Sequence, residues 1–283
     1  MLDILLHLLP PILSCLLYAA LGFHFWQTRW RESEPAPGPA EASLPIQTWE
    51  RTTIFLALAF QAVNLYDGLF STGSMRFSFS LALSLMLWLA VLIYWLESFR
   101  LRLDGLQALV LPLAALCTAL PVFFPQVHVI AHADAWGFKL HFMTAMLAYS
   151  LFTLSALHAV FMGIVERKLH QKSLSRYLTG LPPILAMEAL LFRMIIVAFS
   201  LLTLALGSGV LFSEAIFGKT LALDHKTFFA FASWGIFAAL LIGRQRYGWR
   251  GRIALRWTMT GFLFLLLAYI GSRFVSEVIL GRI

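Results

Sequence analysis

Charged residues and cysteines are scarce in this chain. Only 12% of the 283 residues are charged and 60% are hydrophobic, whereas soluble domains carry about 25% charged residues. Two cysteines are present, and no CxxC or CxxCH occurs, which argues against a thiol oxidoreductase and a covalently attached c-type haem. HExxH, GxSxG and phosphate-loop sequences are also missing, so hydrolytic and nucleotide chemistry have no support. We expect a polytopic membrane protein that is not an enzyme.

What the sequence does contain is a series of long apolar runs. Runs of about 20 residues span a bilayer as helices. We therefore predict an all-α membrane helix bundle of about eight transmembrane helices, with Cys15 and Cys117 as small buried hydrophobes inside two of them. The predicted helices cover about 2–26, 49–68, 77–98, 105–124, 136–170, 184–212, 225–243 and 254–280.

The positive charges predict how the helices are oriented. Most of the 21 Lys and Arg residues fall in alternate loops, and loops rich in Lys and Arg stay in the cytoplasm. This places both termini on the periplasmic side of a bacterial inner membrane. The net charge of +7 thus reflects the membrane and does not suggest nucleic acid; the lipid bilayer is the first expected partner.

We expect a single integral membrane domain over residues 1–283. Residues 1–26 form its first span, 27–48 a cytoplasmic linker rich in Pro, Ala and Glu, and 49–283 a seven-span core. The first span is not a signal peptide, because Asp3 precedes it and the positive charges follow it. Polar residues at Gln61, Asn64 and Asp67 form one stripe, which should face other helices because lipid offers such groups no partners.

Two histidines are the leading candidates for chemistry. His141 lies one turn inside the helix at 136–170, and His225 opens the helix at 225–243. In the predicted topology both lie at the outer side, where two imidazoles from different helices suit axial ligation of a haem iron or one half of a metal site. The alternative is that each is an interfacial histidine bonded to a loop carbonyl.

The remaining ionisable residues have weaker assignments. His128 and His132 are four apart in a loop that we expect to be solvated, and His158 lies too far along its helix to share a ligand with His141. Arg273 is a costly charge within a span; Glu277 one turn later, or an anionic ligand such as a haem propionate, would balance it. Glu188 and Arg193 are expected to pair with each other or with Glu97, and His170 to be solvated.

Two segments carry a resemblance to a known family. These are DHKTFFAFASWGIFAALLIGR at 224–244 and YGWRGRIALRWTMTGFLFLLLAYIGSRF at 247–274. Together with the helix of His141 they resemble the cytochrome c assembly membrane proteins, which include CcsA, ResC and CcmC, and they are most similar to the HemX/YpjD-like inner-membrane branch. The resemblance extends over about residues 55–283, and the YGWRGR loop is its most specific part.

The resemblance implies that His141 takes the place of an external haem-ligating histidine. It also implies haem b as the cofactor and other cytochrome c biogenesis proteins as partners. The family's Trp-rich loop of the WGxxWxWDPKE type is absent; Asp224 and Lys226 echo only its tail. His225 would serve as a substitute second ligand, and Arg273 would hold a propionate.

Two interpretations of function follow. The first is a haem-binding protein that acts in cytochrome c biogenesis or haem homeostasis, favoured by His141, His225 and Arg273 at a common depth. The second is a membrane scaffold or transport-associated protein that retains the fold without haem, favoured by the missing Trp-rich loop.

Overall fold

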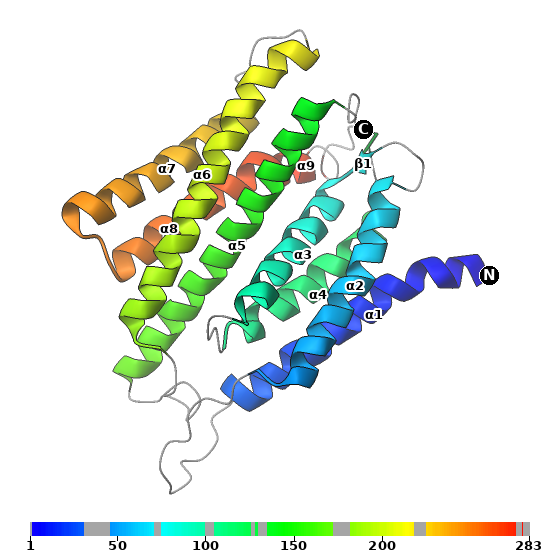
Figure 1. Cartoon of the computed structure of the whole chain (residues 1–283), viewed down its shortest axis with the longest axis horizontal. Helices are drawn as coiled ribbons and strands as arrows, with labels where there is room; N and C mark the ends of the chain where they lie inside the picture. The colour runs from blue at the N-terminus through cyan, green and yellow to red at the C-terminus, as the bar shows by residue number, and fades with distance from the viewer. Residues whose placement is uncertain are drawn as a thin grey trace, which may run out of the picture.

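The protein is a polytopic all-α membrane bundle in which long helices run side by side (Figure 1). The computed structural model describes residues 2–30, 46–70, 75–99, 105–125, 128–129, 135–171, 182–217, 225–275 and 279. The fold class therefore agrees with the sequence prediction. The linker at 31–45, and with it most of the predicted cytoplasmic segment, lies outside the described residues.

The described part of the first half of the chain contains four α-helices and a short two-stranded pairing. Helix α1 continues into the π-helical turn η1, and strands β1 and β2 pair antiparallel, with Phe77 opposite His128. The bounds are α1 Leu2–Phe25, η1 Trp26–Trp30, α2 Thr48–Phe70, β1 Arg76–Phe77, α3 Phe79–Glu97, α4 Gln107–Phe123 and β2 His128–Val129.

The second half contains the two longest helices, α5 and α6, which lie side by side along their length (Figure 1). The α8 helix changes to the π-helical turn η3 before the short α9. The bounds are α5 Trp136–His170, α6 Ile184–Phe217, α7 His225–Tyr247, α8 Arg252–Leu266, η3 Leu267–Gly271 and α9 Ser272–Phe274.

Seven of the described helices are long and apolar enough to cross a membrane. The eighth predicted span corresponds to α4, which is apolar but has only 17 residues. Its two ends nevertheless meet the ends of its neighbours. The Ser80 hydroxyl at the start of α3 donates to the Phe124 carbonyl just after α4, over 3.0 Å. At the other end, the Trp30 indole N–H donates to the Gly105 carbonyl, over 2.9 Å. Helix α4 thus extends from the end of η1 to the start of α3.

The interior is filled mainly by aliphatic and aromatic side chains from all of the long helices. Phe152 of α5 stacks on Phe237 of α7 with ring centroids 4.0 Å apart, and Gly261 of α8 leaves the space that the Phe237 ring occupies. The prediction that the polar stripe of α2 faces other helices is met only in part. Gln61 is fully buried and its amide donates to Ser84 of α3, whereas Asn64 and Asp67 are half-buried.

Ion pairs join helices at the end of the bundle where α5 ends and α6 begins. The buried Glu50 carboxylate accepts from Arg29 at 3.3 Å and from the Gln47 backbone N–H at 2.8 Å, which ties η1 to the start of α2. The Glu188 carboxylate pairs with Arg244 of α7 at 2.6 Å. The predicted pairing of Glu188 with Arg193 was therefore wrong. Residues five apart point to different faces of a helix, and the Arg193 side chain is exposed.

The turn between α7 and α8 folds back on the last turn of α7. The Trp249 indole lies directly over Gly243, where an added Cβ would overlap the ring. The Trp249 backbone N–H donates to the Gly243 carbonyl at 3.2 Å, and the Trp249 ring packs on Trp257 of α8 with centroids 5.0 Å apart. Gly248 and Gly251 take positive φ angles of 65° and 54°, which glycine adopts without strain. The YGWRGR run thus encodes a compact turn.

Candidate functional site

His141 lies one turn inside α5, against the part of α6 that contains Ala205 and Ser208. Its Nδ1 is 2.9 Å from the Ala205 carbonyl oxygen and 3.2 Å from the Ser208 hydroxyl. A carbonyl can only accept a hydrogen bond, so Nδ1 carries the proton and donates it to Ala205. The lone pair of the neutral ring then lies on Nε2. No residue within the described ranges forms a hydrogen bond with Nε2.

A cavity of about 470 Å³ lies beside His141, within the size range of small-molecule and cofactor sites. Its wall is formed by the first half of α5, the first turns of α7, the later part of α6, the α8–η3 junction and Phe77 of β1. Most of the lining is apolar, and four phenylalanines contribute to it: Phe77, Phe138, Phe142 and Phe231. The lining therefore suits an apolar molecule better than a hydrated ion.

A few polar side chains interrupt this apolar wall. Lys226 and Thr227 come from the first turn of α7, and Tyr149 and Tyr269 from α5 and η3. The Tyr149 side chain is buried and the Lys226 side chain is exposed, so the cationic group lies where the cavity opens. Together with His141, this gives an apolar chamber with one imidazole in its wall and one positive charge at its opening.

The sequence-predicted residues are only partly brought together. His141 lines the cavity, whereas His225 is exposed at the start of α7 and is absent from the lining, although its neighbour Lys226 belongs to it. Arg273 belongs to α9, at the end of the chain segment that follows η3; its side chain lies outside the described residues, as does Glu277. The ligand pair of His141 with His225 therefore stays a prediction.

Among the histidines whose side chains the structure describes, His24, His158 and His170 do not line the cavity. His158 is 2% exposed, and its Nε2 donates to the Met187 carbonyl at 3.0 Å, so it packs between α5 and α6 as expected. His170 is exposed, as expected. His128 lies in β2, and His132 lies outside the described residues. Among the described residues, no three His, Cys, Asp or Glu side chains are grouped to hold a metal ion.

Sequence reasoning missed the importance of Lys226, Tyr149 and the phenylalanines of the wall. Lys226 carried a weak signal, because it lies in the DHKT run that echoes a known motif. The aromatic residues carried none, since aromatic side chains are frequent throughout membrane bundles.

Comparison with known proteins gives a family match over most of the chain. The model of the family described as "Cytochrome C assembly protein" matches residues 49–280. Inner membrane protein YpjD of Escherichia coli K12 is 29% identical over 175 residues, which are 62% of this chain and 65% of YpjD. Cytochrome c biogenesis protein CcsA of Prochlorococcus marinus MIT 9215 is 38% identical over 90 residues, which are 32% of this chain and 29% of CcsA.

A third relative is similar in sequence, but its name states no function. It is an uncharacterized 28.8 kDa protein of Azospirillum brasilense, 34% identical over 144 residues, which are 50% of this chain and 52% of that protein. In each of these alignments the chain spans less than two thirds of the relative's length. No solved structure matches.

Proposed function

Since this chain belongs to the cytochrome c assembly protein family, we propose that it binds haem b in the cavity beside His141 and handles this haem during cytochrome c biogenesis or haem homeostasis. The protein is a multi-pass inner-membrane protein. CcsA, by its name, acts in cytochrome c biogenesis, and the same role is proposed for this chain. Its work would be to hold and pass on a cofactor, without a hydrolytic or redox reaction of its own.

The hydrogen bond from His141 Nδ1 to the Ala205 carbonyl carries this proposal. Histidines that ligate metals nearly always donate their other ring nitrogen to a carbonyl or carboxylate, which fixes the tautomer and the ring orientation. Here that bond is made at 2.9 Å between two helices, and Nε2 is left as the ligand atom. An imidazole that served only to pack two helices would not need to line a cavity of cofactor size.

The remaining lining fits the parts of a haem. The four phenylalanines offer apolar surface to the macrocycle, and Lys226 at the opening offers a cation to a propionate. Arg273 is proposed as a second propionate partner and His225 as the second axial ligand. For His225 this requires the first turn of α7 to rotate its exposed side chain inward, because that side chain is not part of the cavity wall. Haem would supply the iron to which the imidazole binds.

The test is the absorption spectrum of the protein purified in mild detergent from haem-replete cells. We expect a Soret band, and extraction of the pigment should identify haem b. His141→Ala should abolish or strongly shift the band, because loss of an axial bond changes the ligand field of the iron. His225→Ala should have a similar or smaller effect, and Arg273→Ala should weaken retention while the spectrum of the residual haem stays the same. His170→Ala, at an exposed position outside the cavity, is the matched control.

Two results would count against the proposal at different levels. A colourless but folded wild-type protein would contradict haem binding and favour the alternative of a membrane scaffold or transport-associated protein that retains the fold without haem. A Soret band that survives His141→Ala unchanged would contradict the ligand assignment alone.

A further inference from the structure

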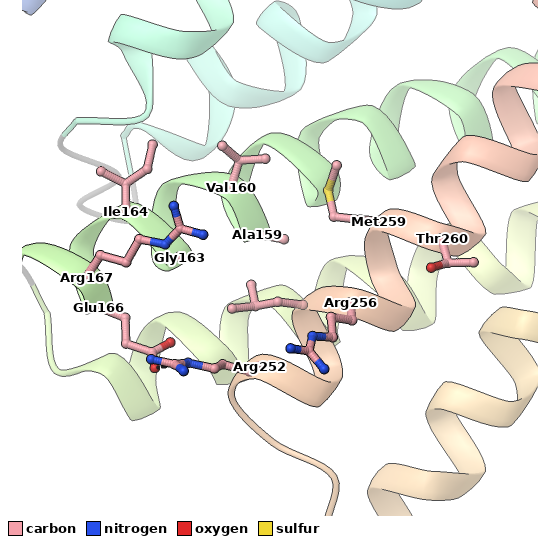
Figure 2. Close-up of a pocket in the computed structure, with 11 residues that line it drawn as sticks. Ala159, Val160, Gly163, Ile164, Glu166, Arg167, Arg252, Arg256, Met259 and Thr260 are labelled. Atoms are coloured by element: carbon pink, nitrogen blue, oxygen red, sulfur yellow. Dashed lines mark hydrogen bonds and ion pairs between the residues drawn. The ribbon is translucent and has the colours of Figure 1, made fainter.

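A second cavity lies at the opposite end of the bundle, between the end of α5 and the start of α8 (Figure 2). Its volume is about 600 Å³. The α5 wall runs from Ala159 to Arg167 and the α8 wall from Arg252 to Thr260, so at 1.5 Å per residue the hollow extends for about 12 Å along each helix. It shares no lining residue with the cavity beside His141.

One end of this cavity is strongly positive. Arg167 comes from α5, and Arg252 and Arg256 come from α8 (Figure 2). The single acidic lining residue, Glu166, pairs with Arg252 at 3.0 Å. Neither Arg167 nor Arg256 forms an ion pair with any residue that the structure describes, and both side chains are exposed. Two guanidinium groups are thus open to an anion from the two walls of one hollow.

The other end of the cavity is apolar and open to the surrounding membrane. Val160 and Met259 are exposed large side chains, and Gly163 has no atom within 4 Å of the position where a Cβ would stand. The basic end lies at the same end of the bundle as the basic last turns of α5 and α7. The positive-inside pattern places these turns at the cytoplasmic surface. The hollow therefore runs from a headgroup layer into the hydrocarbon layer.

We propose that this cavity binds one anionic glycerophospholipid of the inner leaflet, with its phosphate held by Arg167 and Arg256 and an acyl chain lying along Val160, Gly163 and Met259. Charge complementarity selects this occupant. Guanidinium groups recognise phosphate through paired N–H donors, and basic pockets between transmembrane helices bind anionic headgroups. A soluble anion would use the arginines but leave the apolar half of the hollow uncovered. The Glu166–Arg252 pair joins α5 and α8 beside the proposed site.

The test is native mass spectrometry of the full-length protein in detergent, with phosphatidylglycerol or phosphatidylcholine added as the probe. We expect wild-type protein to retain phosphatidylglycerol at least roughly tenfold more tightly than phosphatidylcholine. The double variant R167Q/R256Q should lose this preference. The double variant R246Q/R250Q removes the same charge from exposed positions at the same end of the bundle, outside the cavity, and should keep the preference within about twofold.

A second variant tests the apolar part of the cavity separately from its arginines. Gly163→Leu places its Cβ in open space and leaves all three arginines in place, so it should reduce phosphatidylglycerol retention several-fold without lowering the melting temperature. Equal losses in R167Q/R256Q and R246Q/R250Q would overturn the proposal in favour of general surface charge. Retention unchanged by Gly163→Leu, or full release of the lipid by an excess of inorganic phosphate, would overturn it in favour of a soluble anion.

Discussion

Gly243 is the residue on which the turn between α7 and α8 depends. Its missing side chain leaves room for the Trp249 ring, so Gly243→Ala should displace the indole and destabilise the protein by about 1–3 kcal/mol, as overpacking does. The measurement is the apparent melting temperature in detergent. Gly235→Ala is the control, because it lies on the same helix with no atom within 4 Å of an added Cβ. It should leave stability unchanged or raise it by up to ~1 kcal/mol. Equal melting temperatures for the two variants would contradict the role assigned to Gly243.

His141 shows how far a single residue can be predicted from sequence. Its place one turn inside an apolar helix predicted a position near the membrane surface, and the resemblance to a family predicted a ligand role. The partner of its Nδ1 was not predictable, because Ala205 is 64 positions away and contributes only a backbone carbonyl. Such a contact depends on how α6 packs against α5, and no side-chain pattern records it.

A buried carboxylate is one of the groups that join α6 to α7. Glu188 is nearly fully buried and pairs with Arg244, whose guanidinium also lies 4.6 Å from the centre of the Phe192 ring. Arg244→Gln would leave the Glu188 charge buried without its partner, a change that costs about 3–5 kcal/mol. Thermal unfolding in detergent should show a large drop in melting temperature.

Arg252→Gln is the comparison, since it breaks the pair with Glu166 in a setting where the Arg252 side chain is 67% exposed. Exposed pairs contribute about 0–1 kcal/mol, so this variant should melt close to the wild type. A larger effect from Arg252→Gln than from Arg244→Gln would contradict the assignment of the buried pair as the stronger contact.

Helix positions were largely predictable, whereas irregularities within helices were not. The predicted spans at 184–212 and 225–243 correspond to α6 at Ile184–Phe217 and α7 at His225–Tyr247, because a long apolar run in a membrane has no other way to satisfy its backbone. The last span was expected to be continuous from 254 to 280, but η3 interrupts it at Leu267–Gly271. Local π-helical turns arise from packing and often lie at functional sites, and η3 contributes Tyr269 to the cavity.

Across the whole molecule, the two cavities lie at opposite ends and differ in chemistry. The cavity beside His141 is largely apolar with one imidazole in its wall, and the cavity between α5 and α8 has three arginines at its mouth. The long helix α5 contributes to both. Sequence analysis identified the charges at one end and the histidine at the other, but neither hollow, because each is formed by side chains from helices far apart in the chain.

The orientation of the bundle in the membrane is the last prediction. If α4 crosses the membrane despite its 17 residues, there are eight spans and both termini lie on the periplasmic side. Contacts at both ends of α4 support a full crossing: Trp30 meets Gly105 before α4 begins, and Ser80 meets Phe124 after it ends. The arginine-rich ends of α5 and α7 then lie in the cytoplasm.

Reporter fusions test this orientation directly. Fusions after Arg176 and after Arg252 should give a fluorescent cytoplasmic reporter and inactive alkaline phosphatase, and a fusion after Ala222 should give the reverse. If α4 did not cross, every loop after it would change sides, so all three fusions would read opposite to expectation. That result would also move the cavity of His141 to the cytoplasmic side and the three arginines to the periplasmic leaflet. One set of fusions therefore decides on which side each cavity opens.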